Sequence, residues 1–149
     1  HAEGTHKHLI SEVRIDYSKP WVMQHKRAII SAYRTSAYFE YYQDELFAIL
    51  DSKPERLIDL NTRLLEFFLE KTGIKAEIRM TESYDTAPEC EDLREVIHPK
   101  RPDRILENLE LKKPYFQVFA EKHGFIPDLS IMDLLFNEGP DSIVYLKKL

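Results

Sequence analysis

Asp133 is the residue whose setting points most clearly to chemistry. It lies on one predicted helical stripe with Leu129, Met132 and Phe136, because side chains at i, i+3, i+4 and i+7 share a face of an α-helix. A carboxylate in such a stripe must be paired, hydrogen-bonded or shifted in pKa, since burying an isolated charge is very costly. Functional acids and bases occupy such surroundings, so we predict a catalytic role for Asp133. The alternative is a structural ion pair.

His25 is the second candidate. The chain from Ser18 to Tyr33 predicts a helix, and its apolar stripe includes Trp21, His25 and Ala28. An imidazole on that stripe could act as a general base, a substrate ligand or a metal ligand, and the alternative is a buried histidine satisfied by a carbonyl or a carboxylate. We predict that His25 is the general base and that Asp133 orients its ring.

Further polar residues are candidates for substrate binding. Tyr33 belongs to a cluster of tyrosines, whose rings stack on sugars but which are also common in cores. Lys100 and Arg101 lie in a proline-bounded basic loop that suits a phosphate, although a solvated loop is the alternative. Asn137 follows Asp133 by one helical turn and could bind substrate or close the helix before Pro140.

Metal and cofactor chemistry finds little support in the sequence. His6 and His8 share one face of a predicted strand, but no third ligand is evident, so we predict no metal site. Cys90 lies among acidic residues that disfavour its thiolate. The Rossmann, P-loop, hydrolase-elbow and zincin motifs do not occur, and no cofactor can be named.

These residues must be positioned by a predominantly helical α+β fold. Only 4 of the 149 residues are glycine, which favours helices over a β-structure rich in tight turns. Two strands are too few for a free-standing sheet, so we expect further strands to precede them in an N-terminal part that is missing. Alternating apolar residues predict the strands at 6–16 and 74–80, and helical periodicity predicts helices at 18–33, 36–49, 54–72, 92–97, 115–122 and 128–137, with a last helix after 139–140.

The charge balance restricts the partners. A net charge of −5 argues against unassisted binding to nucleic acid or to an anionic membrane. No apolar run approaches the roughly 18 residues of a membrane span, so we expect a soluble protein. Cys90, the single cysteine, cannot form an intramolecular disulfide, which fits the cytoplasm.

Three blocks of the chain resemble the WbqC-like family of bacterial proteins. The resemblance covers the later two-thirds of such a protein, so we expect residues 1–149 to form a single domain, its C-terminal portion. The blocks are Glu12–Asp16 running into Trp21–Tyr33, then Tyr38–Tyr42, and finally Tyr115–Phe119 with Gly124-Phe125 and the Leu129–Pro140 segment.

The resemblance implies a role in O-antigen or other surface-polysaccharide biosynthesis. We expect a transferase that moves an acyl or aminoacyl group to an activated amino sugar, with Gln117, a member of the matching blocks, hydrogen-bonding the sugar or sugar-nucleotide substrate. The alternative is a non-catalytic binding or scaffolding module that meets a protein partner in a polysaccharide-assembly complex. A metal-dependent hydrolase built on His6 and His8 is a weaker alternative.

Overall fold

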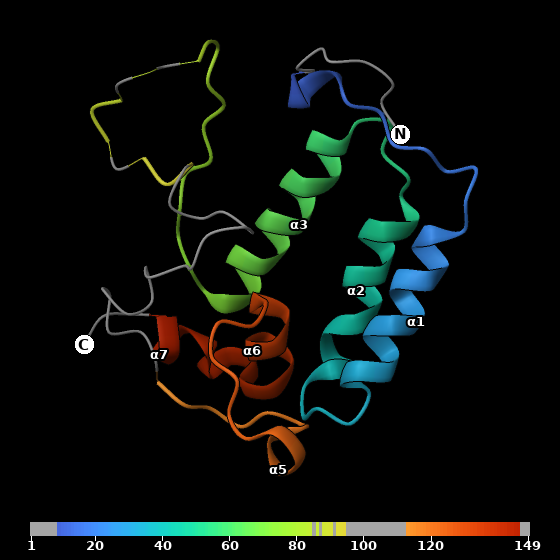
Figure 1. Ribbon diagram of the computed structural model, residues 1–149, viewed down its shortest axis with the longest axis vertical. Helices are drawn as coiled ribbons and strands as arrows, with labels where there is room; N and C mark the ends of the chain where they lie inside the picture. Colours follow the sequence, from blue (N-terminus) through green and yellow to red (C-terminus); the bar gives the residue numbers. More distant parts are fainter. Residues whose placement is uncertain (1–8, 85, 87, 91, 95–112, 147–149) are drawn as a thin grey trace.

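Helices account for nearly all the regular structure of the described chain (Figure 1). The computed structural model describes residues 9–84, 86, 88–90, 92–94 and 113–146. Its elements, in chain order, are η1 (Ile10–Glu12), α1 (Trp21–Tyr33), α2 (Phe39–Asp51), α3 (Leu57–Thr72), α5 (Ala120–His123), α6 (Ile131–Glu138), η2 (Gly139–Asp141) and α7 (Ser142–Leu146).

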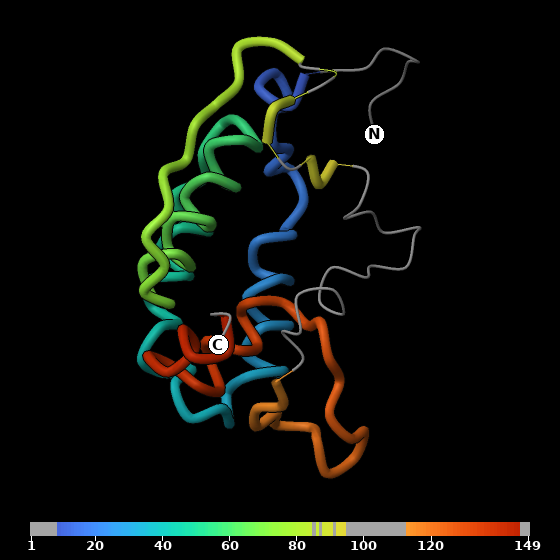
Figure 2. Tube along the Cα trace, turned by 90° about the vertical axis from the view of Figure 1, so that its left-hand side faces the viewer, coloured from blue at the N-terminus to red at the C-terminus, as the bar shows by residue number. Residues whose placement is uncertain are grey.

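The three long helices run alternately down, up and down the molecule (Figure 1). α2 packs between α1 and α3, and short connections at 34–38 and 52–56 join these neighbours. The short helices α5, α6 and α7 gather at the end of the bundle where α1 gives way to α2 and where α3 ends (Figures 1 and 2). α6 contacts both α2 and α3, so it closes this end of the bundle.

The helices follow from apolar residues at helical spacing. Phe39, Tyr42 and Leu46 of α2 recur every three or four residues and are buried, as predicted. α3 ends at Gly73, whose φ of 74° is the left-handed conformation that glycine adopts without strain. The N-cap of α1 is Pro20 and that of α2 is Tyr38, so both helices begin later than the predicted starts at 18 and 36.

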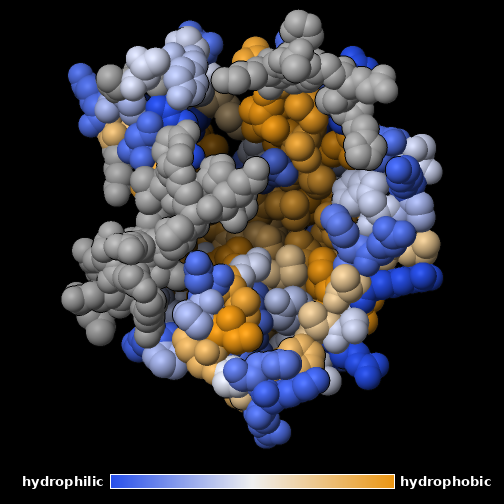
Figure 3. Space-filling view, in the orientation of Figure 1, coloured by the Kyte–Doolittle hydropathy of each residue, from blue (hydrophilic) through white to orange (hydrophobic). Residues whose placement is uncertain are grey.

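The core lies where α6 meets α2 and α3. Phe136 of α6 has no exposed surface, and its ring packs edge-on against Tyr33 and Phe39 with centroids 5.2 and 5.3 Å apart. The Phe136 carbonyl also accepts a hydrogen bond of 2.9 Å from the backbone N–H of Tyr38. Hydrophobic side chains are also gathered in a hollow on the face shown in Figure 3, over α3.

The predicted small sheet is wrong for the part of the chain that the structure describes. Its only β-pairing is an isolated bridge between Arg14 and Arg56. The 3₁₀ turn at Ile10–Glu12 interrupts the first predicted strand, so only its end reaches a partner. Residues 74–80 have no regular structure and run back beside α3 (Figure 2). Apolar alternation predicts a strand only where a neighbouring backbone supplies hydrogen bonds, and here the neighbour is a helix.

Other segments are less regular than predicted. The helix predicted at 115–122 is confined to α5. Asp92–Arg94, at the start of the helix predicted at 92–97, is not helical, and the remaining residues of that prediction lie outside the described chain.

Candidate functional site

A cavity of about 310 Å³ opens between the end of α1, α5 and the start of α6. Its walls combine apolar side chains with ionisable and hydrogen-bonding groups. The lining residues are Tyr33, Gln117, Val118, Phe119, Lys122, His123, Gly124, Ile126, Leu129 and Asp133. The cavity therefore brings together Tyr33, Gln117 and Asp133, three of the residues predicted from the sequence.

Asp133 lies at the inner wall of this cavity and is 6% exposed, which confirms its predicted burial. It stands in the first turn of α6, which Ser130 opens by accepting a hydrogen bond from the backbone N–H of Met132. The Tyr115 hydroxyl donates a 2.7 Å hydrogen bond to Asp133 Oδ2. No cation pairs with this carboxylate among the described residues, so phenol groups stabilise it.

The two phenols beside Asp133 hold their protons strongly. Burial raises the pKa of Tyr33 to about 12, and the neighbouring negative charge and hydrogen bond of Asp133 contribute to the rise. Burial also raises the pKa of Tyr115, and its hydrogen bond to Asp133 adds to the effect. Both hydroxyls are therefore neutral donors near pH 7, facing a carboxylate that accepts.

The raised pKa of Tyr33 predicts a loss of stability in alkali. A phenol that is harder to ionise in the folded state stabilises the fold fully below pH 10, its ordinary pKa, and that contribution disappears as the pH rises through about 12. Tyr33→Phe should therefore flatten part of the fall in unfolding free energy between pH 10 and 12. Urea denaturation across this range measures the effect, with Tyr41→Phe, at an exposed ring, as the control for removing one phenol. Equal pH profiles for wild type and Tyr33→Phe would contradict the assignment.

Gln117 and Asn137 hold the site together through backbone contacts. The Gln117 amide donates to the Ile126 carbonyl at 2.8 Å and accepts from the Ile126 N–H at 2.9 Å, which closes the loop around α5. Asn137 donates to the Asp133 carbonyl at 2.8 Å, and its Oδ1 is buried without a partner among the described residues. Gln117 lines the cavity, whereas Asn137 does not. The predicted contact of each side chain with substrate stays a prediction.

His25 does not line the cavity. Its side chain is exposed on α1, so the prediction that it lies on a buried stripe is wrong. It contacts the edge of Trp21, with ring centroids 5.2 Å apart. His25 precedes Tyr33 by eight residues, about 12 Å along the helix axis, so the structure does not bring it together with Asp133.

His123 is an ionisable cavity residue that sequence reasoning missed. It ends α5 at the exposed rim, next to Lys122. Its only local signal is its place immediately before Gly124, which ends the helix, and that position alone does not indicate a site. The helix predicted at 115–122 stops one residue before His123, and a basic residue near a helix C-terminus is commonly explained by the helix dipole.

A model of the WbqC-like protein family matches residues 1–107 of the chain, well over half of its length. The chain belongs to the WbqC-like protein family. A search of curated proteins adds Rv1507c, an uncharacterized protein of Mycobacterium tuberculosis that is 26% identical, over 97% of this chain and 72% of its own length. No solved structure matches the chain.

The WbqC-like match includes Tyr33 but ends before Tyr115 and Asp133. The cavity of this WbqC-like protein is therefore assigned from its geometry, and α6 lies in the part of the chain beyond the family match.

Several predicted site residues lie outside the described chain. They are Lys100 and Arg101 of the basic loop and His6 and His8 of the metal pair. Within the described residues, no group of three or more histidine, cysteine, aspartate or glutamate side chains could hold a metal ion. No helix found in those same residues is long and apolar enough to cross a membrane.

Proposed function

We propose that this WbqC-like protein binds an activated amino sugar in the Asp133 cavity and transfers an acyl or aminoacyl group to its amine. The observation that carries the proposal is a buried carboxylate in a cavity, which phenols hydrogen-bond and which pairs with no cation among the described residues. Such a carboxylate can accept hydrogen bonds from an amine and attract its protonated form. The surface-polysaccharide setting is part of the proposal and comes from what the sequence resemblance implies.

The proposed chemistry needs a base, and Asp133 fits that role better than His25 because it lines the cavity. The amine nitrogen forms a bond to the acyl carbon, and the bond from that carbon to the leaving group breaks with its electron pair. Asp133 accepts the proton that the nitrogen loses. Tyr33, on the cavity wall, would accept a hydrogen bond from a substrate hydroxyl or amine, because its own proton is donated to Asp133. His123 at the rim would contact the substrate or the leaving group.

A second candidate is a binding module that holds the same ligand without turning it over. The observation that favours it is that the hydrogen bonds of the Gln117 and Asn137 amides are made to backbone atoms of the chain itself. Four apolar side chains around the cavity are exposed, which suits a protein partner: Phe116, Phe119, Ile126 and Leu129.

Thermal unfolding with paired ligands tests the proposal. Nucleoside-diphosphate amino sugars should raise the melting temperature, whereas the matching sugars with a hydroxyl in place of the amine should raise it less. At about 100 times its dissociation constant, a ligand adds roughly 2.7 kcal/mol, or about 5–10 °C for a chain of this size. Asp133→Asn, which keeps the size of the side chain, should remove the extra shift that the amino sugar gives over the matching hydroxyl sugar.

Asp128→Asn is the matched control. Asp128 is exposed, lies two residues before Ser130, the N-cap of α6, and does not line the cavity. It should bind like wild type. Equal binding by Asp133→Asn and wild type would refute the site. With a thioester or aminoacyl donor added, mass spectrometry separates the two candidates: an acylated amino sugar supports the transferase, and binding without product supports the module.

A further inference from the structure

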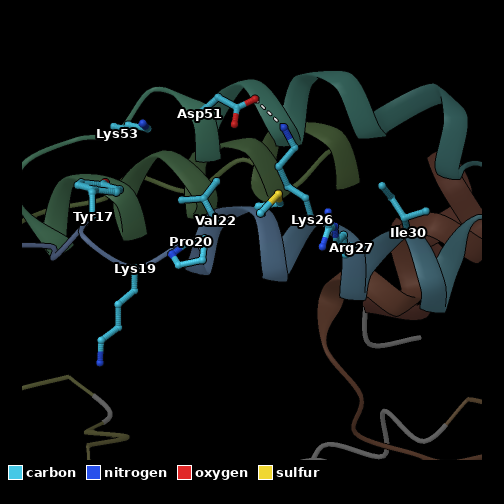
Figure 4. Close-up of a pocket in the computed structure, with 10 residues that line it drawn as sticks. Tyr17, Lys19, Pro20, Val22, Lys26, Arg27, Ile30, Asp51 and Lys53 are labelled. Carbon is cyan, nitrogen blue, oxygen red and sulfur yellow. Dashed lines mark hydrogen bonds and ion pairs between the residues drawn. The ribbon is translucent and has the colours of Figure 1, made fainter.

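A second hollow, of about 440 Å³, lies between α1 and the end of α2, outside the Asp133 cavity (Figure 4). We infer that this α1–α2 groove binds a phosphate ester that carries an apolar or aromatic group, such as a nucleoside diphosphate. The inference does not depend on the proposed transferase activity, because the two cavities share no lining residue.

The groove concentrates positive charge on an acidic protein. Four cations and one carboxylate line it, although the whole chain carries a net charge of −5. Asp51 neutralises one cation, since its Oδ2 lies 2.7 Å from Lys26 Nζ. The three cations without an ion-pair partner among the described residues are Lys19, Arg27 and Lys53. Unpaired cations around a concave surface favour a multiply charged anion.

These cations come from different parts of the chain. Figure 4 shows Arg27 on α1 and Lys53 beyond the end of α2, while Lys19 extends away from the other side chains. The positive charge of the groove is therefore supplied mainly by Arg27, from α1, and by Lys53, from the segment after α2. The start of α1 adds to it, because no side chain caps this helix end and its first N–H groups carry the positive end of the helix dipole.

The remaining wall suits an apolar or planar group. It is formed by Tyr17, Val22, Met23 and Ile30. The Tyr17 ring stacks on Trp21, with centroids 5.6 Å apart, and its hydroxyl donates to the Pro54 carbonyl at 2.8 Å. This hydrogen bond joins the segment before α1 to the segment after α2, so the aromatic wall is held in place before any ligand binds.

Lys53 offers a variant whose effect on binding is separable from its effect on folding. Its φ of 46° is unfavourable for a residue with a side chain. Lys53→Gly should therefore raise the melting temperature while it removes a cation from the groove. A variant that binds more weakly because it is partly unfolded would melt at a lower temperature, so weaker binding with a higher melting temperature must come from the lost charge. Arg27→Gln removes the second charge, and Lys75→Ala, at an exposed lysine outside the groove, is the control for lowering the net charge by one.

Isothermal titration calorimetry of the protein with UDP and with inorganic diphosphate tests the inference. We expect UDP to bind more tightly than diphosphate, and Lys53→Gly and Arg27→Gln each to weaken UDP binding about tenfold. Lys75→Ala and Asp133→Asn should bind UDP like wild type, so failure of the transferase proposal leaves this result intact. Absence of UDP binding, equal affinity for UDP and diphosphate, or an equal loss in Lys75→Ala would overturn the assignment.

Discussion

Phe136→Ala is expected to lower the free energy of unfolding by about 3–5 kcal/mol. The Phe136 ring has no exposed surface and packs against Phe39 of α2 and Tyr33 of α1. Removing it leaves a void at the junction of three helices and also withdraws the support behind Tyr33, which lines the Asp133 cavity. Urea denaturation at neutral pH measures the loss.

Phe116→Ala removes the same group from a surface site and serves as the control. Phe116 is 66% exposed, so its loss should change the unfolding free energy by less than about 0.5 kcal/mol. A similar loss of unfolding free energy in both variants would contradict the placement of Phe136 at the centre of the core.

Gly139→Ala should cost about 3 kcal/mol or more, from two causes acting together. The backbone of Gly139 has φ 54° and ψ −127°, a region that side chains rarely allow. An added Cβ would also lie 2.5 Å from a ring carbon of Tyr38, far inside van der Waals contact. Because Gly139 joins α6 to η2, relief of the clash would displace the segment that follows Asp133. Thermal and urea unfolding measure the effect.

Gly73→Ala separates the cost of backbone strain from the cost of the steric clash with Tyr38. Gly73 has φ 74°, but a Cβ there meets nothing within 4 Å. Its alanine variant should therefore cost only about 1–2 kcal/mol, from the left-handed backbone alone. If the two glycine variants were equally destabilised, the close packing of Tyr38 on Gly139 would be wrong.

The long helices could be predicted from the sequence because their signals are local. Phe39, Tyr42 and Leu46 show a buried stripe by spacing alone, and Gly73 marks the end of α3 by its residue type. The strands could not be predicted reliably, because pairing depends on which backbone lies alongside. Residues 74–80 have the alternation of a strand but lie beside α3.

The site was predicted in part for the same reason. The residues next to Asp133 in the short helix α6 are mostly apolar, so its burial is evident from the local sequence. α1 has polar and apolar residues distributed around it, and none of its side chains is fully buried. Its inward face is therefore ambiguous from spacing, and His25 lies on the exposed side. The approach of Tyr115 to Asp133 is a tertiary contact that no local pattern contains.

Chemical-shift mapping tests most directly whether ligand binds in the Asp133 cavity. An isotope-labelled chain would be titrated with a nucleoside-diphosphate amino sugar, and its backbone amide resonances followed by NMR. A matching nucleoside diphosphate without the sugar would be titrated in parallel to identify changes that belong to the α1–α2 groove. We expect additional, sugar-dependent shifts at Tyr33, at 117–126 and at the start of α6. Sugar-dependent shifts confined to the exposed face of α1 around His25, or none at all, would contradict binding in this cavity.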